Sequence, residues 1–357
     1  MLYKRLIRLA GFLSLLLVGC SEDKLQDVTY LDDLFYLRND RADMPVAVQG
    51  NLGSRKLLLF LQGGPSGGAQ ALSYARTFNR LEQRYAIAYW DQRATGEAKG
   101  SFPSTYLNRA QYVDDLDKLI TLLKYRYGED ISIFLMGISW GGMLGNTYLI
   151  QHPEEESIKG WIEINGGHSF PLIRKASPQL VVEIADEQIT AGNSVSEWER
   201  LKAVALDFDT TNTAFDYLID YFQQVFDAEY LLVKDGVVIE EDEFGELEGK
   251  LLNVPFNLLT TTFGDLLFQA NNFVNKALIE DTFVPDNFDK ITVPTLLLWG
   301  AYDMRTPPVL GEQALEKLGT PEEDKRLVIF EESYHPLVTN EPEKFYNEVT
   351  TFIDQYP

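Results

Sequence analysis

Residues 136–145 read MGISWGGMLG, a segment in which one serine stands among glycines. The residues before it, ISIFLM (131–136), form a short apolar run with β-branched side chains, which predicts a buried strand. The residues after it space their apolar side chains as a helix does. Ser139 therefore lies between a predicted strand and a predicted helix, with Gly137 and Gly141 two positions away on either side.

The pattern G-x-S-x-G between a strand and a helix is typical of a nucleophile elbow. Such a turn makes the serine Oγ project from the sheet, and small neighbours are needed because larger ones would collide with the strand and the helix. The helix that follows directs its N-terminus at the reaction centre, which favours developing negative charge. We interpret Ser139 as a candidate nucleophile; the alternative is an ordinary strand-to-helix turn, in which glycine and serine are common.

Strand and helix patterns alternate on both sides of this turn. The predicted strands cover residues 34–38, 44–48, 57–61, 86–90, 131–136, 160–165, 294–300 and 326–330, and the predicted helices cover 71–84, 108–128, the segment after Ser139, 309–318 and 343–356. This alternation predicts an α/β fold with a mostly parallel sheet and helices on both faces. Between 168 and 290 the sequence is acidic, aromatic and helical in pattern, which predicts a mainly helical cap (168–290) inserted into a core of residues 30–167 and 291–357.

Composition limits the classes of function. The chain has 357 residues, of which 45% are hydrophobic and 24% charged, as in an ordinary globular protein. Its formal net charge of −23 argues against nucleic acid as a partner, because phosphates require a surface rich in lysine and arginine. The charge is compatible with a cationic ligand, although solubility alone accounts for much acidity.

The N-terminus, MLYKRLIRLAGFLSLLLVGC (1–20), has a basic start and an apolar run (9–18) that is short for a membrane-spanning helix. Its end, LVGC, resembles the lipobox of bacterial lipoproteins. That resemblance implies cleavage of a signal peptide (1–19), lipid on Cys20 and a polar tether (20–29), hence anchoring to a membrane of the bacterial cell envelope, either periplasmic or surface-facing. The alternatives are an ordinary cleaved signal peptide, or a buried helix with an incidental thiol. An intramolecular disulfide is impossible because the chain has one cysteine.

A serine nucleophile needs a base, and the chain has three histidines. His152 lies at the end of the predicted helix after Ser139, where a structural role is expected. His168 follows a predicted strand and either lines the pocket or is structural. His335 follows the last predicted strand, and Asp303 follows the strand before it. The order Ser139, Asp303, His335 is that of the α/β-hydrolase triad, although singly Asp303 could be a turn cap and His335 a surface residue.

An oxyanion hole requires two donors. We expect one to be the main-chain N–H of Trp140, the residue after the nucleophile. The glycine-rich loop QGGPSGG (62–68) follows a predicted strand, and Gly64 is the candidate for the second N–H, the alternative being a plain tight turn. Such chemistry needs no metal and no organic cofactor, and the sequence contains no metal-ligand spacing.

These motifs together resemble the proline iminopeptidase branch of the α/β-hydrolases, over about residues 30–167 and 290–357. That family has an HGGPG loop, a DQRG loop, a GxSWGG elbow, and an Asp and a His late in the chain. The corresponding segments here are QGGPSGG (62–68), DQRATG (91–96), GISWGG (137–142), GAYDMRTPP (300–308) and ESYHPL (332–337). The resemblance implies an α/β-hydrolase fold and a serine aminopeptidase that releases an N-terminal residue, proline preferred, from short peptides through an acyl-enzyme.

The sequence departs from the family pattern at Gln62, where histidine is usual, and at Ser66 and Ala94, where glycine is usual. Family peptidases bind the free amine of the substrate with acidic cap residues, one of them in a Trp-Glu pair. Trp198-Glu199 resembles that pair, so the resemblance implies Glu199 as a substrate-binding residue; the alternative is a solvated face of a helix.

Two other functions remain as alternatives. The same triad serves carboxylesterase-type hydrolases of small esters or amides, and the fold by itself does not choose between them. A non-catalytic lipoprotein that binds ligands through its cap has no need of Ser, Asp and His at these places. The substrate is therefore expected to be a small peptide or ester, and the sequence leaves the oligomeric state open.

Overall fold

The computed structural model describes residues 29–64, 68–101, 104–245 and 287–357. The predicted signal peptide, Cys20 and nearly all of the predicted tether lie outside the described residues, as do Ser66 and residues 246–286 of the predicted cap.

A single sheet organises the described residues. Its strands are β1 (Tyr30–Asn39), β2 (Ala42–Asn51), β3 (Lys56–Leu61), β4 (Ala86–Trp90), β5 (Lys99–Gly100), β6 (Ser132–Ile138), β7 (Ile158–Ile164), β8 (Thr295–Gly300) and β9 (Lys325–Phe330). Their order is β1-β2-β4-β3-β6-β7-β8-β9, with β5 beside β2. All pairs from β4 to β9 are parallel, and the pairs made by β2 are antiparallel. The predicted mostly parallel sheet is confirmed.

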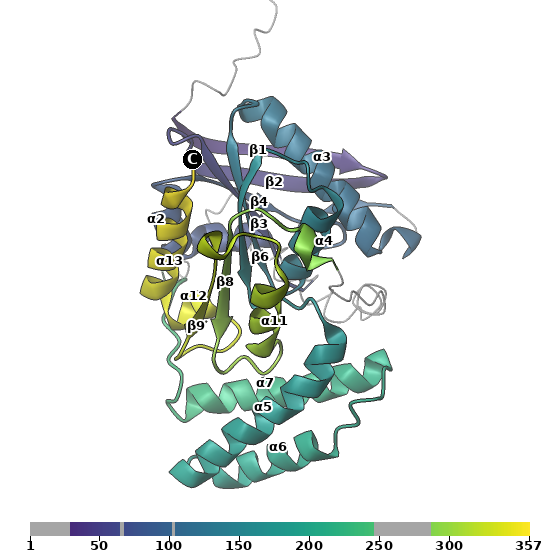
Figure 1. The fold of residues 1–357 in the computed structure, drawn as a ribbon, viewed down its shortest axis with the longest axis vertical. Helices are drawn as coiled ribbons and strands as arrows, with labels where there is room; N and C mark the ends of the chain where they lie inside the picture. The colour runs from purple at the N-terminus through teal and green to yellow at the C-terminus, as the bar shows by residue number, and fades with distance from the viewer. Residues whose placement is uncertain (1–28, 65–67, 102–103, 246–286) are drawn as a thin grey trace, which may run out of the picture.

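Helices cover both faces of this sheet. They are α2 (Arg76–Glu82), α3 (Arg109–Tyr127), α4 (Trp140–Gln151), α11 (Val309–Lys317), α12 (Leu337–Asn340) and α13 (Pro342–Gln355), with short 3₁₀ turns η3 (Ala69–Tyr74), η4 (Ser104–Tyr106), η5 (Phe288–Lys290) and η6 (Glu322–Asp324). Figure 1 shows α2 and α13 on one side of the sheet and α3, α4 and α11 on the other.

The central strands explain why both faces are covered. Along β3, Leu57 and Leu59 join the apolar core beneath α3 and α4, while Leu58 and Phe60 join the core beneath α2 and α13. Successive side chains of a strand point to opposite faces, so a continuous apolar run requires apolar partners on both sides. The two-layer covering predicted from sequence follows from this pattern.

The predicted helix over 71–84 is wrong in one respect, because the structure divides it into η3 and α2. Ala75 between them is extended, with φ −69° and ψ 136°. The main-chain N–H of Arg76 donates to the Glu243 carbonyl at 3.0 Å, and the N–H of Thr77 donates to the Glu243 carboxylate at 2.7 Å. Glu243, far along the chain, thus provides acceptors for the first turn of α2. The local pattern of apolar residues in 71–84 does not predict this contact.

The helical region between β7 and β8 contains α5 (Phe170–Ala191), α6 (Val195–Asp207) and α7 (Phe215–Lys234). Figure 1 shows these three helices together at one end of the molecule, beyond the sheet. We refer to α5, α6 and α7 as the cap helices. None of the helices in the described ranges has the length and hydropathy needed to cross a membrane.

Candidate active site

Ser139 lies in the turn between β6 and α4 with φ 54° and ψ −113°, a left-handed conformation that side chains other than glycine rarely adopt. Main-chain hydrogen bonds to several segments hold the turn in place. The Ser139 N–H donates to the Ile164 carbonyl at 2.9 Å, and the Ser139 carbonyl accepts from Gly142 and Gly167 at 3.0 Å each. The sharp strand-to-helix turn expected from the pattern is present, and neighbouring segments maintain its strain.

The glycines around Ser139 are required by close contacts. A Cβ on Gly137 would lie 2.4 Å from the Gly141 carbonyl oxygen and 2.7 Å from the Trp161 ring. A Cβ on Gly141 would lie 1.9 Å from the Leu61 carbonyl oxygen at the end of β3. These glycines therefore let α4 pack directly against the strands that carry the turn.

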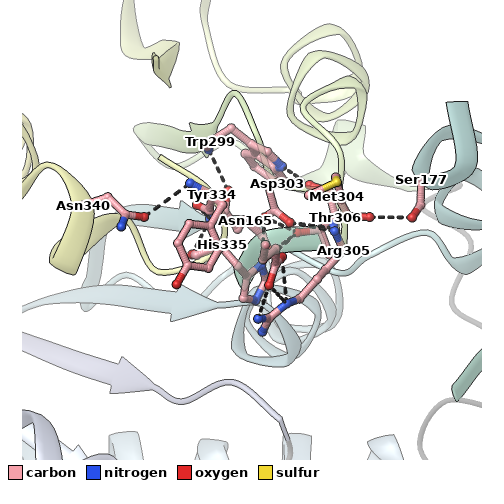
Figure 2. Close-up of polar contacts among 12 residues, drawn as sticks. Asn165, Ser177, Trp299, Asp303, Met304, Arg305, Thr306, Tyr334, His335 and Asn340 are labelled. Atoms are coloured by element: carbon pink, nitrogen blue, oxygen red, sulfur yellow. Dashed lines mark hydrogen bonds and ion pairs between the residues drawn. The ribbon is translucent and has the colours of Figure 1, made fainter. Parts of the chain in front are cut away.

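His335 and Asp303 lie together, as Figure 2 shows. Nδ1 of His335 is 2.8 Å from Oδ2 of Asp303, whose side chain is fully buried. The carboxylate also accepts the N–H groups of Arg305 and Thr306 at 2.9 Å each, both at Oδ1. With its oxygens held in this way, Asp303 is oriented to keep the His335 ring in one position and one tautomer.

Asn165 joins the two loops that carry Asp303 and His335. Its Nδ2 donates to the His335 carbonyl at 2.7 Å, and its Oδ1 accepts the N–H of Gly300 at 3.0 Å (Figure 2). Thr306 Oγ1 lies 2.8 Å from Asp303 Oδ2 and 3.0 Å from the Asn165 carbonyl. The sequence analysis missed both residues, although Asn165 ends a predicted strand and Thr306 belongs to GAYDMRTPP.

A cavity of about 490 Å³ brings the predicted residues together. Ser139, His335, Gly64 and Trp140 all line it. Its walls are mostly apolar and come from the sheet side and from two cap helices; they include Phe60, Leu72, Phe170, Ile173, Phe222 and Phe226. Among the described residues that line the cavity there is no aspartate or glutamate, and Arg305 is the charged side chain.

The two residues expected to supply the oxyanion donors, Trp140 and Gly64, line the same cavity as Ser139. Trp140 is the first residue of α4, so its N–H has no acceptor within the helix. Gly64 follows β3 with φ 115°, a conformation that favours glycine. The structure thus brings both predicted oxyanion donors to the cavity that Ser139 lines.

The segment DQR (91–93) contacts the residue that follows Ser139. Oε1 of Gln92 accepts the indole N–H of Trp140 at 3.0 Å, and Arg93 forms a fully buried ion pair with Asp115 at 2.7 Å. Ala94, which stands where the family has glycine, keeps a positive φ of 60°. Gln62, which stands where the family has histidine, is buried and donates to Thr95 Oγ1 at 2.6 Å.

The structure does not bring Glu199 to the cavity. Glu199 is exposed on α6, which contributes no residue to the cavity lining, whereas its neighbour Trp198 is buried and donates to Asp235 at 3.3 Å. His168 is buried, with Nδ1 2.8 Å from the Glu163 carboxylate. His152 directly follows α4 and stacks on Tyr148, in keeping with the structural role expected of it.

A carboxylate on α7 lies closer to the site than Glu199. Glu229 is almost fully buried and pairs with Arg305, whose Nε lies 3.0 and 2.8 Å from its two oxygens. Burial raises the pKa of Glu229 to about 7, and the charge of Arg305 opposes that rise. This pair was not predicted from the sequence. Arg305 belongs to the segment GAYDMRTPP, but nothing local distinguishes Glu229 from the other acidic residues of the cap.

Comparisons with known proteins find similarity to serine aminopeptidases. A family model described as serine aminopeptidase, S33, matches residues 54–187. A protein of Bacillus subtilis strain 168 named "Probable aminopeptidase YbaC" is 27% identical over 307 residues, covering 82% of this chain and 87% of that protein. A proline iminopeptidase of Saccharolobus solfataricus is 27% identical over 305 residues, covering 85% of this chain and 86% of that protein.

Among solved structures, VinJ aligns with a TM-score of 0.60 at 19% identity, covering 91% of this chain and 99% of that chain. At this identity the likeness concerns the fold alone. The mostly parallel sheet with helices on both faces is the architecture that this likeness concerns. The chain thus has the α/β-hydrolase fold, and its sequence is similar to those of proteins named as aminopeptidases.

Proposed function

We propose that the protein is a serine hydrolase that releases an N-terminal residue, proline preferred, from short peptides through an acyl-enzyme. The observation that carries the proposal is the hydrogen bond between His335 and Asp303 beside Ser139, at one cavity. The relatives named as aminopeptidases and proline iminopeptidases support the peptidase reading.

The proposed reaction follows from the tautomer that Asp303 favours. When Nδ1 of His335 donates to Asp303, Nε2 is the nitrogen left to accept the proton of Ser139. The Ser139 oxygen then bonds to the substrate carbonyl carbon, and Asp303 stabilises the imidazolium that results.

The tetrahedral intermediate carries a negative oxygen, which the N–H groups of Trp140 and Gly64 stabilise. His335 returns its proton to the leaving amine, and the scissile bond breaks. A water molecule, deprotonated by His335, then attacks the acyl-enzyme and regenerates Ser139. No metal or organic cofactor takes part in these steps.

The cavity supports a small substrate with an apolar N-terminal residue. Phe170, Phe222 and Phe226 give the cavity an apolar lining, and a proline ring is an apolar group of suitable size. The volume of about 490 Å³ is ample for a dipeptide.

A carboxylesterase-type hydrolase is the second candidate, and one observation favours it. A peptidase that requires a free amine needs a carboxylate to pair with that amine, and no Asp or Glu side chain lines the described part of the cavity. Glu229, close by, is engaged by Arg305. A neutral ester would enter this apolar cavity without needing such a partner.

The test compares proline β-naphthylamide, its N-acetylated form and p-nitrophenyl acetate, using the full-length chain and Ser139→Ala. Cleavage of the free-amine substrate alone, absent in the variant, is the expected result. Cleavage of the ester alone would replace the peptidase by the esterase. Lack of Ser139-dependent turnover on all three would contradict both.

For location we propose a lipid anchor on Cys20, after removal of residues 1–19. The basic start, the short apolar run and the position of the cysteine support it. In a bacterial host, the intact protein is expected in the membrane fraction with a mass that corresponds to a chain starting at an acylated Cys20. Cys20→Ala should retain residues 1–19 or release the protein; an unmodified Cys20 in the wild type would exclude the anchor.

A further inference from the structure

Arg305 belongs to the loop that carries Asp303, and it lines the cavity. It lies two residues after Asp303, and its main-chain N–H donates to Oδ1 of that aspartate at 2.9 Å. Its side chain lines the same cavity as Ser139 and His335 and is 30% exposed. A positive charge therefore stands among mostly apolar lining residues of this cavity, and Figure 2 shows Arg305 near His335 and Asp303.

Helix α7 holds the guanidinium of Arg305 on two sides. Nε and Nη2 bind the carboxylate of Glu229, with Nε 2.8 Å from Oε2. The ring of Phe226 lies 4.2 Å from the guanidinium carbon, at cation–π distance. The side chain is thus preorganised, so that binding another group costs little further side-chain entropy.

The Glu229 contact leaves part of the guanidinium unused. An arginine side chain presents several N–H donors in a planar fork, and the Glu229 carboxylate occupies the edge formed by Nε and Nη2. Nη1 has no hydrogen-bond partner among the residues that the structure describes. These remaining donors suit an anionic oxygen acceptor. The other lining residues are mostly apolar and provide few competing partners.

We propose that Arg305 is a specificity-determining residue that binds a carboxylate of the substrate. This inference rests on the function proposed above, in which the carboxylate is the C-terminus of a dipeptide. Dipeptides with a free C-terminus are therefore preferred over their amides. A charged carboxylate forms stronger hydrogen bonds with a guanidinium than a neutral amide oxygen does.

The surrounding charges are compatible with an anion at this place. The oxygens of Asp303 already accept from His335, Thr306 and the main chain. Glu229 occupies the edge of the guanidinium formed by Nε and Nη2, and burial raises its pKa to about 7. At neutral pH the Arg305–Glu229 pair therefore carries a net positive charge in part of the molecules.

The experiment measures kcat/KM of the full-length chain for Pro-Phe and for Pro-Phe amide. The variants are Arg305→Met and Arg305→Lys, with Arg305→Met/Glu229→Gln added so that Glu229 is not left buried as an unpaired carboxylate. The matched control is Arg200→Met, because Arg200 also pairs with α7, through Asp227 at 3.0 Å, but lies outside the cavity lining.

We expect the wild type and Arg200→Met to prefer the free carboxylate by about tenfold or more. The preference should disappear in both Arg305→Met variants and persist in part in Arg305→Lys. An equal rate on both substrates in the wild type, or a preference that survives Arg305→Met, would overturn the proposal. The latter result would leave Arg305 as a purely structural tie between the cap and the core.

Calorimetric titration of Ser139→Ala with the same two dipeptides separates this proposal from the proposed function. If neither dipeptide is cleaved but Pro-Phe binds more tightly than its amide, the aminopeptidase fails and the Arg305 proposal stands. If both are cleaved equally in a Ser139-dependent manner, the aminopeptidase stands and the Arg305 proposal fails. If neither cleavage nor preferential binding occurs, both fail.

Discussion

At the scale of single residues, Ser139 combines strain with function. Its φ of 54° and ψ of −113° are maintained by hydrogen bonds from three directions, and the same geometry exposes its side chain to the cavity. Strained residues of this kind persist where the surrounding structure over-determines them, which is common at active sites. Activity and stability should therefore respond differently to substitutions at this position.

We predict that Ser139→Ala and Ser139→Gly both lower kcat by about four orders of magnitude or more. Ser139→Gly should nevertheless be about 1 kcal/mol more stable than Ser139→Ala, because glycine adopts this backbone conformation without the Cβ clash. Urea unfolding of the two variants measures the difference. Equal midpoints, or a more stable alanine variant, would show that the turn stores no such strain.

Asp91 is a second residue whose burial has a measurable consequence. It is fully buried, Oδ1 has no partner among the described residues, and burial raises its pKa to about 7. The folded state thus binds this proton more tightly than the unfolded state, where the pKa is about 3.9. Wild-type stability should fall as pH rises through this interval, by roughly 4 kcal/mol in total.

We predict that Asp91→Asn removes this loss of stability at rising pH. Its stability relative to the wild type should grow by roughly 2 to 3 kcal/mol between about pH 5 and about pH 8, since asparagine cannot ionise. Urea unfolding at both pH values measures the effect. Asp130→Asn is the control, because its exposed carboxylate has a pKa already lowered by Arg55 and does not titrate in this interval. Parallel curves for Asp91→Asn and wild type would refute the prediction.

At the scale of elements, the contact between β3 and α4 depends on the absence of a side chain. Gly141 lies in the first turn of α4, where a Cβ would meet the Leu61 carbonyl at 1.9 Å. A backbone carbonyl cannot rotate away as a side chain can, so the helix itself would have to move. The last glycine of the G-x-S-x-G pattern is therefore required for packing as well as for catalysis.

We predict that Gly141→Ala lowers the free energy of unfolding by roughly 3 kcal/mol and disrupts the oxyanion donors next to it. Gly167→Ala is the matched control for stability, because the nearest atoms to its new Cβ lie 3.7 Å away. Thermal unfolding of the two variants tests this. A Gly141→Ala protein as stable as Gly167→Ala would mean that α4 can shift without cost.

Elements with strong local patterns were predicted well from sequence. The strand at 86–90 agrees residue for residue with β4, and the long helix ends at Gly128, which has a positive φ of 113° as a C-cap glycine should. The helix over 71–84 was predicted less well, because its division at Ala75 depends on Glu243. Propensity and periodicity describe a segment and its neighbours, whereas such a cap comes from a distant part of the chain.

At the scale of the whole molecule, the formal net charge is −23. Like charges on a compact particle repel, and salt screens that repulsion over a distance that falls from ~30 Å at low ionic strength to a few Å in concentrated salt. Surface ion pairs are weakened by the same screening, but acidic residues outnumber basic ones by 54 to 31. Net repulsion should therefore dominate the response to salt.

We predict that the melting temperature at pH 7 rises by several degrees from about 10 mM to about 500 mM NaCl. The control is the same titration near the sequence pI of about 4.5, where the net charge vanishes and the rise should disappear. A melting temperature that falls with salt at pH 7 would mean that stabilising ion pairs outweigh the repulsion among the excess acidic residues.

The amino-acid pattern by itself determined the α/β architecture, the strand-to-helix turn at Ser139 and the chain order of Ser139, Asp303 and His335. These properties are local, since alternation of apolar residues and the conformational needs of glycine act within a few positions. It also singled out the loop that supplies Gly64.

Only the tertiary structure decided which side chains meet. Asn165 joins the Asp303 and His335 loops, Glu229 reaches Arg305 from a cap helix, and Glu199 remains exposed on another. Many acidic residues occupy the cap, and their helical patterns are alike. Which of them approaches the site depends on how each helix packs and rotates against the core, a property of long-range contacts that no local pattern records.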